Sequence, residues 1–211
     1  MAVHVFIDNS NIFGGAQRAA ATIEPGIPWC AIRVYYRNLF SLLEAGRKVE
    51  TRVLGGSVPP GNDELWEYAR RQHYSTDLLK RVEADDGRLV EQAVDEMLHF
   101  RIANALLDYE APQTLIIASG DGRENNRDAS FPNQIRRALR RGWDVEVYSW
   151  SEQLNGLFAR MASEGDGHLI VRTLNPYYSS LTFVRGGTYS VYGSTTTISD
   201  RIVAPLRSRE G

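Results

Sequence analysis

The sequence has little cysteine, little lysine and no long apolar run. Cys30 is the one cysteine among 211 residues, which excludes an internal disulfide and any zinc site built from several cysteines. We therefore expect an intracellular, reducing location, in the cytoplasm or the nucleus. No stretch approaches the roughly 20 apolar residues of a membrane-spanning helix. The first apolar run, Val3 to Ile7, ends at Asp8, so we expect neither a membrane partner nor a signal peptide.

The chain also lacks an excess of charge of one sign. Lys+Arg is 24 and Asp+Glu is 26, giving a formal net charge of -2. This balance excludes a globally basic coat for nucleic acid, although a local basic patch is compatible with it. Lysine occurs only at Lys48 and Lys80, so nearly all positive charge is arginine. With 43% hydrophobic residues, the chain can bury a core of ordinary domain size.

Strands alternate with helices along most of the chain. This alternation predicts a three-layer α/β/α fold with a mainly parallel central sheet. Glycines at Gly14-Gly15 predict a turn, and Pro28 predicts the start of a helix that continues to Gly46. Asp86-Gly87 predicts a hairpin between 78–83 and 89–92. The remaining strands are expected at 3–7, 50–54, 114–118 and 144–149, and the remaining helices at 63–73, 94–109, 131–141 and 152–162.

The character of the sequence changes after Gly165. Helical patterning disappears, and short strands are expected at 169–173, 181–184 and 188–191. We therefore divide the chain into a domain at 1–165 and a β-rich C-terminal extension at 166–211, with a frayed tail from about Ser199. The aromatic residues of the extension, Tyr189 among them, either stack bases of a single strand or pack a small β core.

Three acids stand where open α/β folds place their functional sites. Asp8 ends the first strand, Asp121 follows the most apolar strand, and Asp95 opens the helix after the hairpin. If the two strands are neighbours, their acids meet at one edge of the sheet. Carboxylates gathered there repel, which raises one pKa or demands a divalent cation. Without nearby cysteine or paired histidine, such ligands favour Mg²⁺ or Mn²⁺, and this chemistry suits phosphodiester hydrolysis.

Each acid alone has a plainer interpretation as a helix cap or a turn former. His99, one turn beyond Asp95, either assists proton transfer or makes a structural hydrogen bond. A phosphotransfer domain is disfavoured because Ser10 stands where a dehalogenase-type loop needs a second acid. A nicotinamide enzyme is disfavoured because no Gly-x-Gly-x-x-Gly pattern follows the first strand.

The acidic motifs also resemble a known family. The run from Val5 to Asn11 resembles the opening hydrophobic-Asp-x-x-Asn strand of NYN domains, which belong to the PIN-like nuclease superfamily. The run from Ala93 to Leu98 resembles the Val-Asp-x-x-Leu motif of their central helix, and that from Ala118 to Gly122 their Ser-Gly-Asp loop. The resemblance covers about residues 3–163. The Val-Asp-Glu-x-Leu-His form and Ser130-Phe131-Pro132 look closer to eukaryotic, fungal-type members than to bacterial ones.

This resemblance implies a metal-dependent endoribonuclease that prefers single-stranded RNA. It places the carboxylates of the Mg²⁺ or Mn²⁺ site at Asp8, Asp95 and Asp121. It further implies that Asn11 orients Asp8 or the phosphate and that Ser119 steadies the loop. A homodimer is left open.

The chain departs from the family pattern at two positions. Many members carry a second acid further along the central helix, where this chain offers His99 and Arg101. Many members also carry a further acid at the second position after the Ser-Gly-Asp acid, where this chain has Arg123. Glu124 replaces that acid if the loop is shifted, and Asp128 is another candidate. These departures favour a second hypothesis, a catalytically weak or inactive RNA-binding or scaffold version of the same fold.

Arginines follow the proposed acidic centre. Their planar fork suits phosphate, because it donates two hydrogen bonds at once. On a helix, positions 136, 137 and 140 form adjacent rows that could follow an RNA backbone; the alternative is a solvated helix face. The candidates for RNA binding are Arg123, Arg127, Arg136, Arg137 and Arg140.

Overall fold

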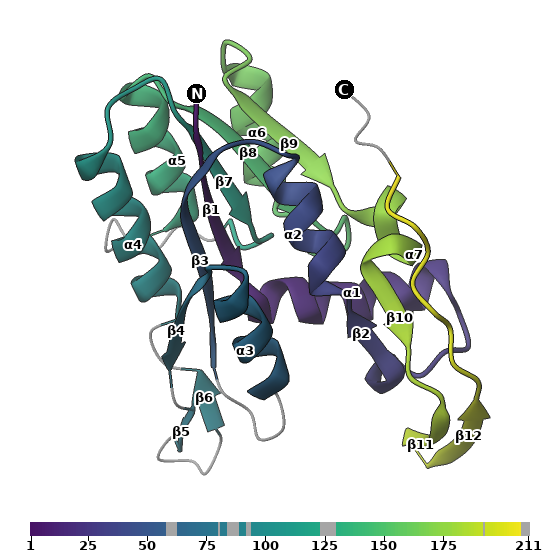
Figure 1. The fold of residues 1–211 in the computed structure, drawn as a ribbon. Coiled ribbons are helices and arrows are strands. Elements are labelled where there is room, and N and C mark those ends of the chain that lie inside the picture. The colour runs from purple at the N-terminus through teal and green to yellow at the C-terminus, as the bar shows by residue number, and fades with distance from the viewer. Residues whose placement is uncertain are drawn as a thin grey trace.

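A six-stranded sheet in which all neighbouring strands run parallel forms the centre of the molecule (Figure 1). The computed structural model describes residues 1–57, 63–79, 81–83, 89–91, 94–122, 130–191 and 193–207. The predicted α/β class with a parallel sheet is confirmed. In spatial order the strands are β4 (Ser75–Leu79), β3 (Val49–Ser57), β1 (Val3–Asp8), β7 (Thr114–Ala118), β8 (Asp144–Ser149) and β9 (Leu169–Thr173).

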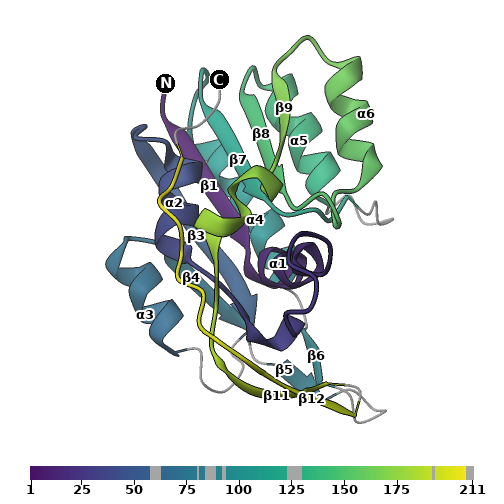
Figure 2. The ribbon, with the colours of Figure 1, turned by 90° about the vertical axis from the view of Figure 1, so that its right-hand side faces the viewer.

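Helices cover both faces of this sheet and give it three layers (Figures 1 and 2). Strand β1 is buried along its whole length. Its Val5 and Ile7 belong to one apolar core and Phe6 to the other, as the alternation of a strand requires. The core that contains Phe6 is shared with α4 (Val94–Asp108), α5 (Phe131–Arg140) and α6 (Gly156–Glu164). The core that contains Val5 and Ile7 is shared with α1 (Asn9–Ile23), α2 (Tyr36–Glu44) and α3 (Asp63–Arg71).

The predicted turn at Gly14-Gly15 is wrong, because both glycines lie inside helix α1. The reason is steric. A Cβ at Gly15 would lie 2.4 Å from Cδ1 of Trp150, whose Nε1 donates a 2.9 Å hydrogen bond to the carbonyl of Ile12. Glycine therefore lets the helix approach the indole closely, at a modest cost in helix propensity.

The single helix predicted from Pro28 to Gly46 is also wrong. The chain forms a short 3-10 helix (η1, Trp29–Ala31), strand β2 (Ile32–Val34) and then α2. Strand β2 pairs antiparallel with β10 (Thr182–Val184), so a contact between distant parts of the chain overrides the local helical spacing. Trp29, within the span of the predicted helix, is 50% exposed.

Two further differences concern the ends of elements. The helix predicted from Glu152 begins later, at Gly156, after the cap residue Asn155. The strand predicted over 78–83 is divided between the end of β4, in the central sheet, and β5 (Arg81–Glu83). The predicted hairpin is present as an antiparallel pair, β5 (Arg81–Glu83) with β6 (Leu89–Glu91). Its predicted turn at Asp86-Gly87 lies outside the described residues.

Strand β9 (Leu169–Thr173) belongs to the central sheet, although the sequence placed it in the C-terminal extension. The remaining segment forms η2 (Asn175–Tyr177), α7 (Tyr178–Leu181), β10 and the hairpin of β11 (Gly187–Val191) and β12 (Ser194–Ile198). Arg201 fastens it: its Nε donates to Glu24 at 2.9 Å, its Nη1 to the Thr182 carbonyl at 2.8 Å, and its guanidinium lies 5.3 Å from the Tyr178 ring centre.

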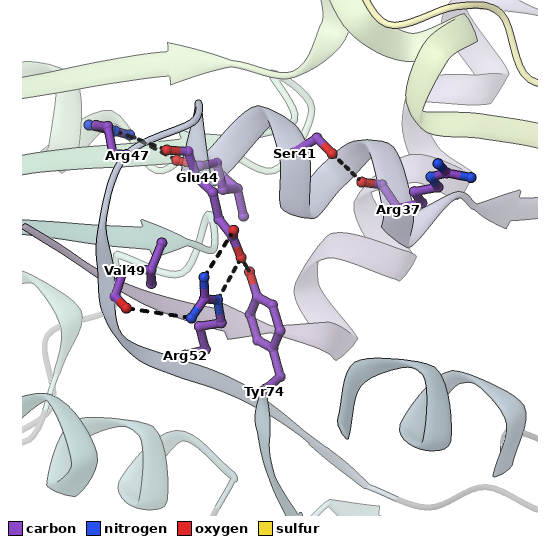
Figure 3. Close-up of polar contacts among 8 residues, drawn as sticks. Arg37, Ser41, Glu44, Arg47, Val49, Arg52 and Tyr74 are labelled. Carbon is purple, nitrogen blue, oxygen red and sulfur yellow. Dashed lines mark hydrogen bonds and ion pairs between the residues drawn. The ribbon is translucent and has the colours of Figure 1, made fainter. Parts of the chain in front are cut away.

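An ion pair between Glu44, at the end of helix α2, and Arg52 of β3 holds the helix against the strands (Figure 3). Glu44 accepts hydrogen bonds from Arg52 Nε at 2.9 Å and from the Tyr74 hydroxyl at 3.0 Å. Nearby, Arg47 donates to Glu146 on β8 at 2.8 Å. Both pairs are largely shielded from water and serve the fold. Within the described residues, no helix combines the length and apolarity needed to cross a membrane.

Candidate active site at the switch point of the sheet

Asp8 lies at the point where the topology of the sheet changes direction. From β1 the chain builds outward through β3 and β4, and then returns to the other side of β1 to form β7. At such a point the loops diverge and leave a crevice beyond the carboxyl ends of the central strands. Asp8 is the last residue of β1, and Ser119 follows directly after β7. The expected adjacency of these two strands is confirmed.

The carboxylate of Asp8 is held by two hydrogen bonds and is only 5% exposed. Its Oδ1 accepts from the backbone N–H of Asn11 at 3.0 Å, so Asp8 is the N-cap of helix α1. Its Oδ2 accepts from the hydroxyl of Ser119 at 3.0 Å. The cap interpretation is thus confirmed, but the second bond joins this cap to the other strand. Asp8 has further interactions beyond these two.

A chain of hydrogen bonds continues from Asp8 to the loop that carries Asp121. The Ser119 hydroxyl accepts from the backbone N–H of Asp121 at 3.2 Å while it donates to Asp8. The side-chain oxygen of Asn11 accepts from the backbone N–H of Gly120 at 2.7 Å. Asn11 and Ser119 therefore fix the loop after β7 to the start of α1.

The loop after β7 also packs tightly against the segment after β8. A Cβ at Gly120 would lie 2.4 Å from the backbone oxygen of Gln153, and one at Gly122 would lie 2.6 Å from Cβ of Asn155. The N–H of Asn155 donates to the carbonyl of Gly120 at 3.2 Å. Sequence reasoning missed Gln153 and Asn155. The signal that could have pointed to them is their position after the end of a strand, the same feature that points to Asp8.

Glycine at the end of β3 lets two helices approach the site. In the register of the sheet, Gly55 lies opposite Asp8. A Cβ at Gly55 would lie 2.9 Å from Leu98 of α4, and one at Gly56 would lie 2.7 Å from Trp66 of α3. Helix α4 thus packs closely over the strand beside Asp8, and Asp95 lies in the first turn of this helix, one turn before Leu98.

His99 is buried between α4 and α5. It is 5% exposed, and its ring meets the ring of Phe131 edge-on at 4.7 Å. Burial lowers the pKa of His99, and the nearby acids Glu96 and Asp121 oppose that change. Neither ring nitrogen has a hydrogen-bond partner among the described residues. The predicted structural hydrogen bond is therefore not found there, and the ring packs as part of the core.

Hard oxygen donors at this edge suit Mg²⁺ or Mn²⁺ better than softer metals. Asp8 and Asp121 carry such donors, and Ser119 joins the Asp8 carboxylate to the backbone N–H of Asp121. Among the side chains that the structure describes, His, Cys, Asp and Glu form no group of three placed to hold a metal. Two of the four predicted ligands, the Asp95 side chain and Glu124, lie outside that part of the chain.

The predicted RNA-binding arginines fall in two places. Arg123 and Arg127 lie outside the described residues. Arg136 and Arg137 are half-buried on α5, and Arg140 is exposed. Arg136 donates to the Asn133 side chain at 2.8 Å, so part of its donor capacity is used within the helix. Helix α5 follows β7 and begins with Ser130 as its cap.

The comparisons with known proteins bear on the fold. No protein-family model matches the chain, and no curated protein sequence does. Among solved structures, the chain is similar to a protein of unknown function from Vibrio parahaemolyticus RIMD 2210633, with a TM-score of 0.53 and 13% identity. The match covers 81% of this chain and 92% of that one. At this identity the similarity is one of fold alone.

Proposed function

We propose that the protein is a divalent-metal-dependent endoribonuclease of the NYN type, acting on single-stranded RNA at the carboxyl edge of the sheet. The observation that carries this proposal is the hydrogen-bonded link from Asp8 through Ser119 to Asp121. It joins the ends of β1 and β7 at the switch point, where α/β folds bind ligands. The single cysteine agrees with a reducing compartment, the cytoplasm or the nucleus.

The residues of the chain would act mainly by orientation. Two hydrogen bonds hold the Asp8 carboxylate in one orientation. Ser119 and Asn11 hold the Gly120–Asp121 backbone at that carboxylate. A divalent ion bound by these acids would supply charge stabilisation at the scissile phosphate and a more acidic water.

A catalytically weak or inactive RNA-binding version of the fold is the second candidate. One observation favours it: His99, in the helix region where many NYN members carry a second acid, is packed into the core against Phe131. A histidine in that position does not replace a carboxylate at a cation site, because its ring nitrogens are softer donors.

The test is cleavage of a labelled single-stranded RNA with Mn²⁺ or Mg²⁺, with EDTA as a control. Asp8→Asn is the informative variant, because asparagine caps a helix about as well as aspartate, while the charge and the second oxygen, which accepts from Ser119, are lost. We expect Asp8→Asn and Asp95→Asn each to reduce cleavage by at least about 100-fold. The matched control is Asp108→Asn, at the other end of α4 and exposed.

The outcomes separate the two candidates. Metal-dependent cleavage that Asp8→Asn abolishes and Asp108→Asn leaves intact supports the nuclease. RNA binding without cleavage under either metal supports the inactive version. Cleavage that persists in EDTA and in Asp8→Asn comes from a contaminant and removes the support for the proposal.

A further inference from the structure

A pocket of about 280 Å³ lies between helix α1, the segment 26–29 and the hairpin β11–β12. Neither the acidic centre nor the metal chemistry uses it. Gln17 and Ala21 of α1 form one wall, Ile27 and Trp29 a second, and Tyr189 and Thr196 of the hairpin a third. Its volume lies just below the range of pockets that hold drug-sized ligands, so it suits a smaller group.

Trp29 is the unusual residue of this pocket. It is 50% exposed, whereas the other three tryptophans, Trp66, Trp143 and Trp150, are each 1% exposed. A large indole surface in contact with water on a pocket wall offers a stacking platform for a flat ring. Tyr189, on the facing hairpin, is fixed by a 2.7 Å hydrogen bond from its hydroxyl to the carbonyl of Arg185.

The lining determines what kind of group fits. None of the residues that line the pocket carries a charge. Its polar groups are the amide of Gln17 and the hydroxyls of Ser194 and Thr196, with Tyr189 beside them. Amides and hydroxyls both donate and accept hydrogen bonds. This chemistry matches a neutral heteroaromatic ring with a polar edge, such as a nucleobase, and does not match a phosphate group.

Helix α1 connects this pocket to the acidic centre. It begins directly after Asp8 and runs across the carboxyl edge of the sheet toward β10 and the hairpin (Figures 1 and 2). Ser10, Gly14, Gln17 and Ala21 follow one another at helical spacing on one face. At 1.5 Å per residue, Gln17 lies about 13 Å and Ala21 about 20 Å along the axis from Asp8.

We propose that this pocket binds one unstacked base of the RNA strand whose phosphate reaches the Asp8 edge, with Trp29 as the stacking surface. The proposal rests on the proposed function and extends it, because it gives the site a base-binding position away from the cleaved bond. Ser10 and Gly14, on the helix face between the acidic centre and the pocket, are half-buried and have small side chains, and the exposed Arg18 adds a cation on α1.

Tryptophan fluorescence gives a direct test, since Trp29 is the one exposed tryptophan. A single-stranded oligonucleotide in EDTA binds without cleavage and should quench this emission. Affinity is measured separately by anisotropy of a labelled oligonucleotide. We expect Trp29→Ala to weaken binding about 5- to 100-fold, as for loss of one stacked base. Trp29→Phe should restore most of the affinity. Leu107→Ala, a truncation of an exposed apolar residue on α4, should change nothing.

The outcomes distinguish this proposal from the nuclease function. Trp29-dependent binding without cleavage supports the pocket even if the nuclease proposal fails. Cleavage abolished by Asp8→Asn with unchanged affinity in Trp29→Ala overturns the pocket alone. A proline-rich peptide that quenches Trp29, where the oligonucleotide does not, overturns it too and assigns the aromatic pocket to peptide binding. Absence of any oligonucleotide binding also overturns it.

Discussion

The hydroxyl of Ser119 is the structural link between the two acids, and Ser119→Ala tests it. Ser119 is fully buried, donates to Asp8 and accepts from the backbone of Asp121. A hydrogen bond to a charged group contributes about 1.5–3 kcal/mol, and a buried N–H left without a partner costs about 1–3 kcal/mol. Allowing for partial rescue by water at this edge, we expect a loss of about 3 kcal/mol in the free energy of unfolding.

Ser149→Ala is the matched control. Ser149 is equally buried, but its hydroxyl donates to a neutral acceptor, the carbonyl of Trp150 at 3.1 Å. We expect a loss of about 1 kcal/mol there. For a chain of this size the melting temperature falls by about 2–4 °C per kcal/mol, so Ser119→Ala should melt about 6–12 °C lower and Ser149→Ala about 2–4 °C lower. Urea unfolding followed by circular dichroism measures both variants, and equal losses would refute the reasoning.

Three further predictions concern the fold. Gly15→Ala should cost about 1–3 kcal/mol because its Cβ meets Trp150, whereas Gly14→Ala, with its nearest atom 3.8 Å away, should gain about 0.5–1 kcal/mol; urea midpoints that move in the same direction would contradict this. Burial lowers the pKa of His4, so the unfolded state takes up its proton first and stability should fall as pH drops from about 7 to 5. His4→Phe should flatten that slope in urea titrations at each pH; an unchanged slope would assign it to other groups. Arg201→Gln should speed proteolysis of the C-terminal segment, and an unchanged cleavage pattern would show that its contacts do not hold that segment.

Much of the site could be predicted because parallel strands end at one edge. Once the first strand and the most apolar strand are neighbours, Asp8 and the Ser119–Asp121 loop must meet, and they do. Asn155 had only its position after a strand end as a signal, since its hydrogen bond to Gly120 is made by backbone atoms and does not depend on residue type. His99 is singled out by the sequence for its chemistry, and only the structure shows that its ring is buried edge-on against Phe131.

The errors in the fold have a common physical cause. Gly14-Gly15 was interpreted as a turn because glycine is a weak helix former, but the close approach to Trp150 required glycine within the helix. The segment 29–34 has helical spacing, yet its pairing with β10, about 150 positions later, decided its conformation. Leu169–Thr173 has no local feature that distinguishes a sixth sheet strand from a strand of the extension.

The sequence by itself determined the α/β class, the buried strands and the ends of strands at which acids lie. The fold class, the buried strands and the strand ends depend only on hydrophobic periodicity and turn residues, and both of these act over a few positions of the chain. Only the tertiary structure decided the strand order, the hydrogen-bonded link through Ser119, and the exposure of Trp29 on a pocket wall. Each of these depends on which distant segments pack together, and close packing of side chains, which no local pattern encodes, selects among the alternatives.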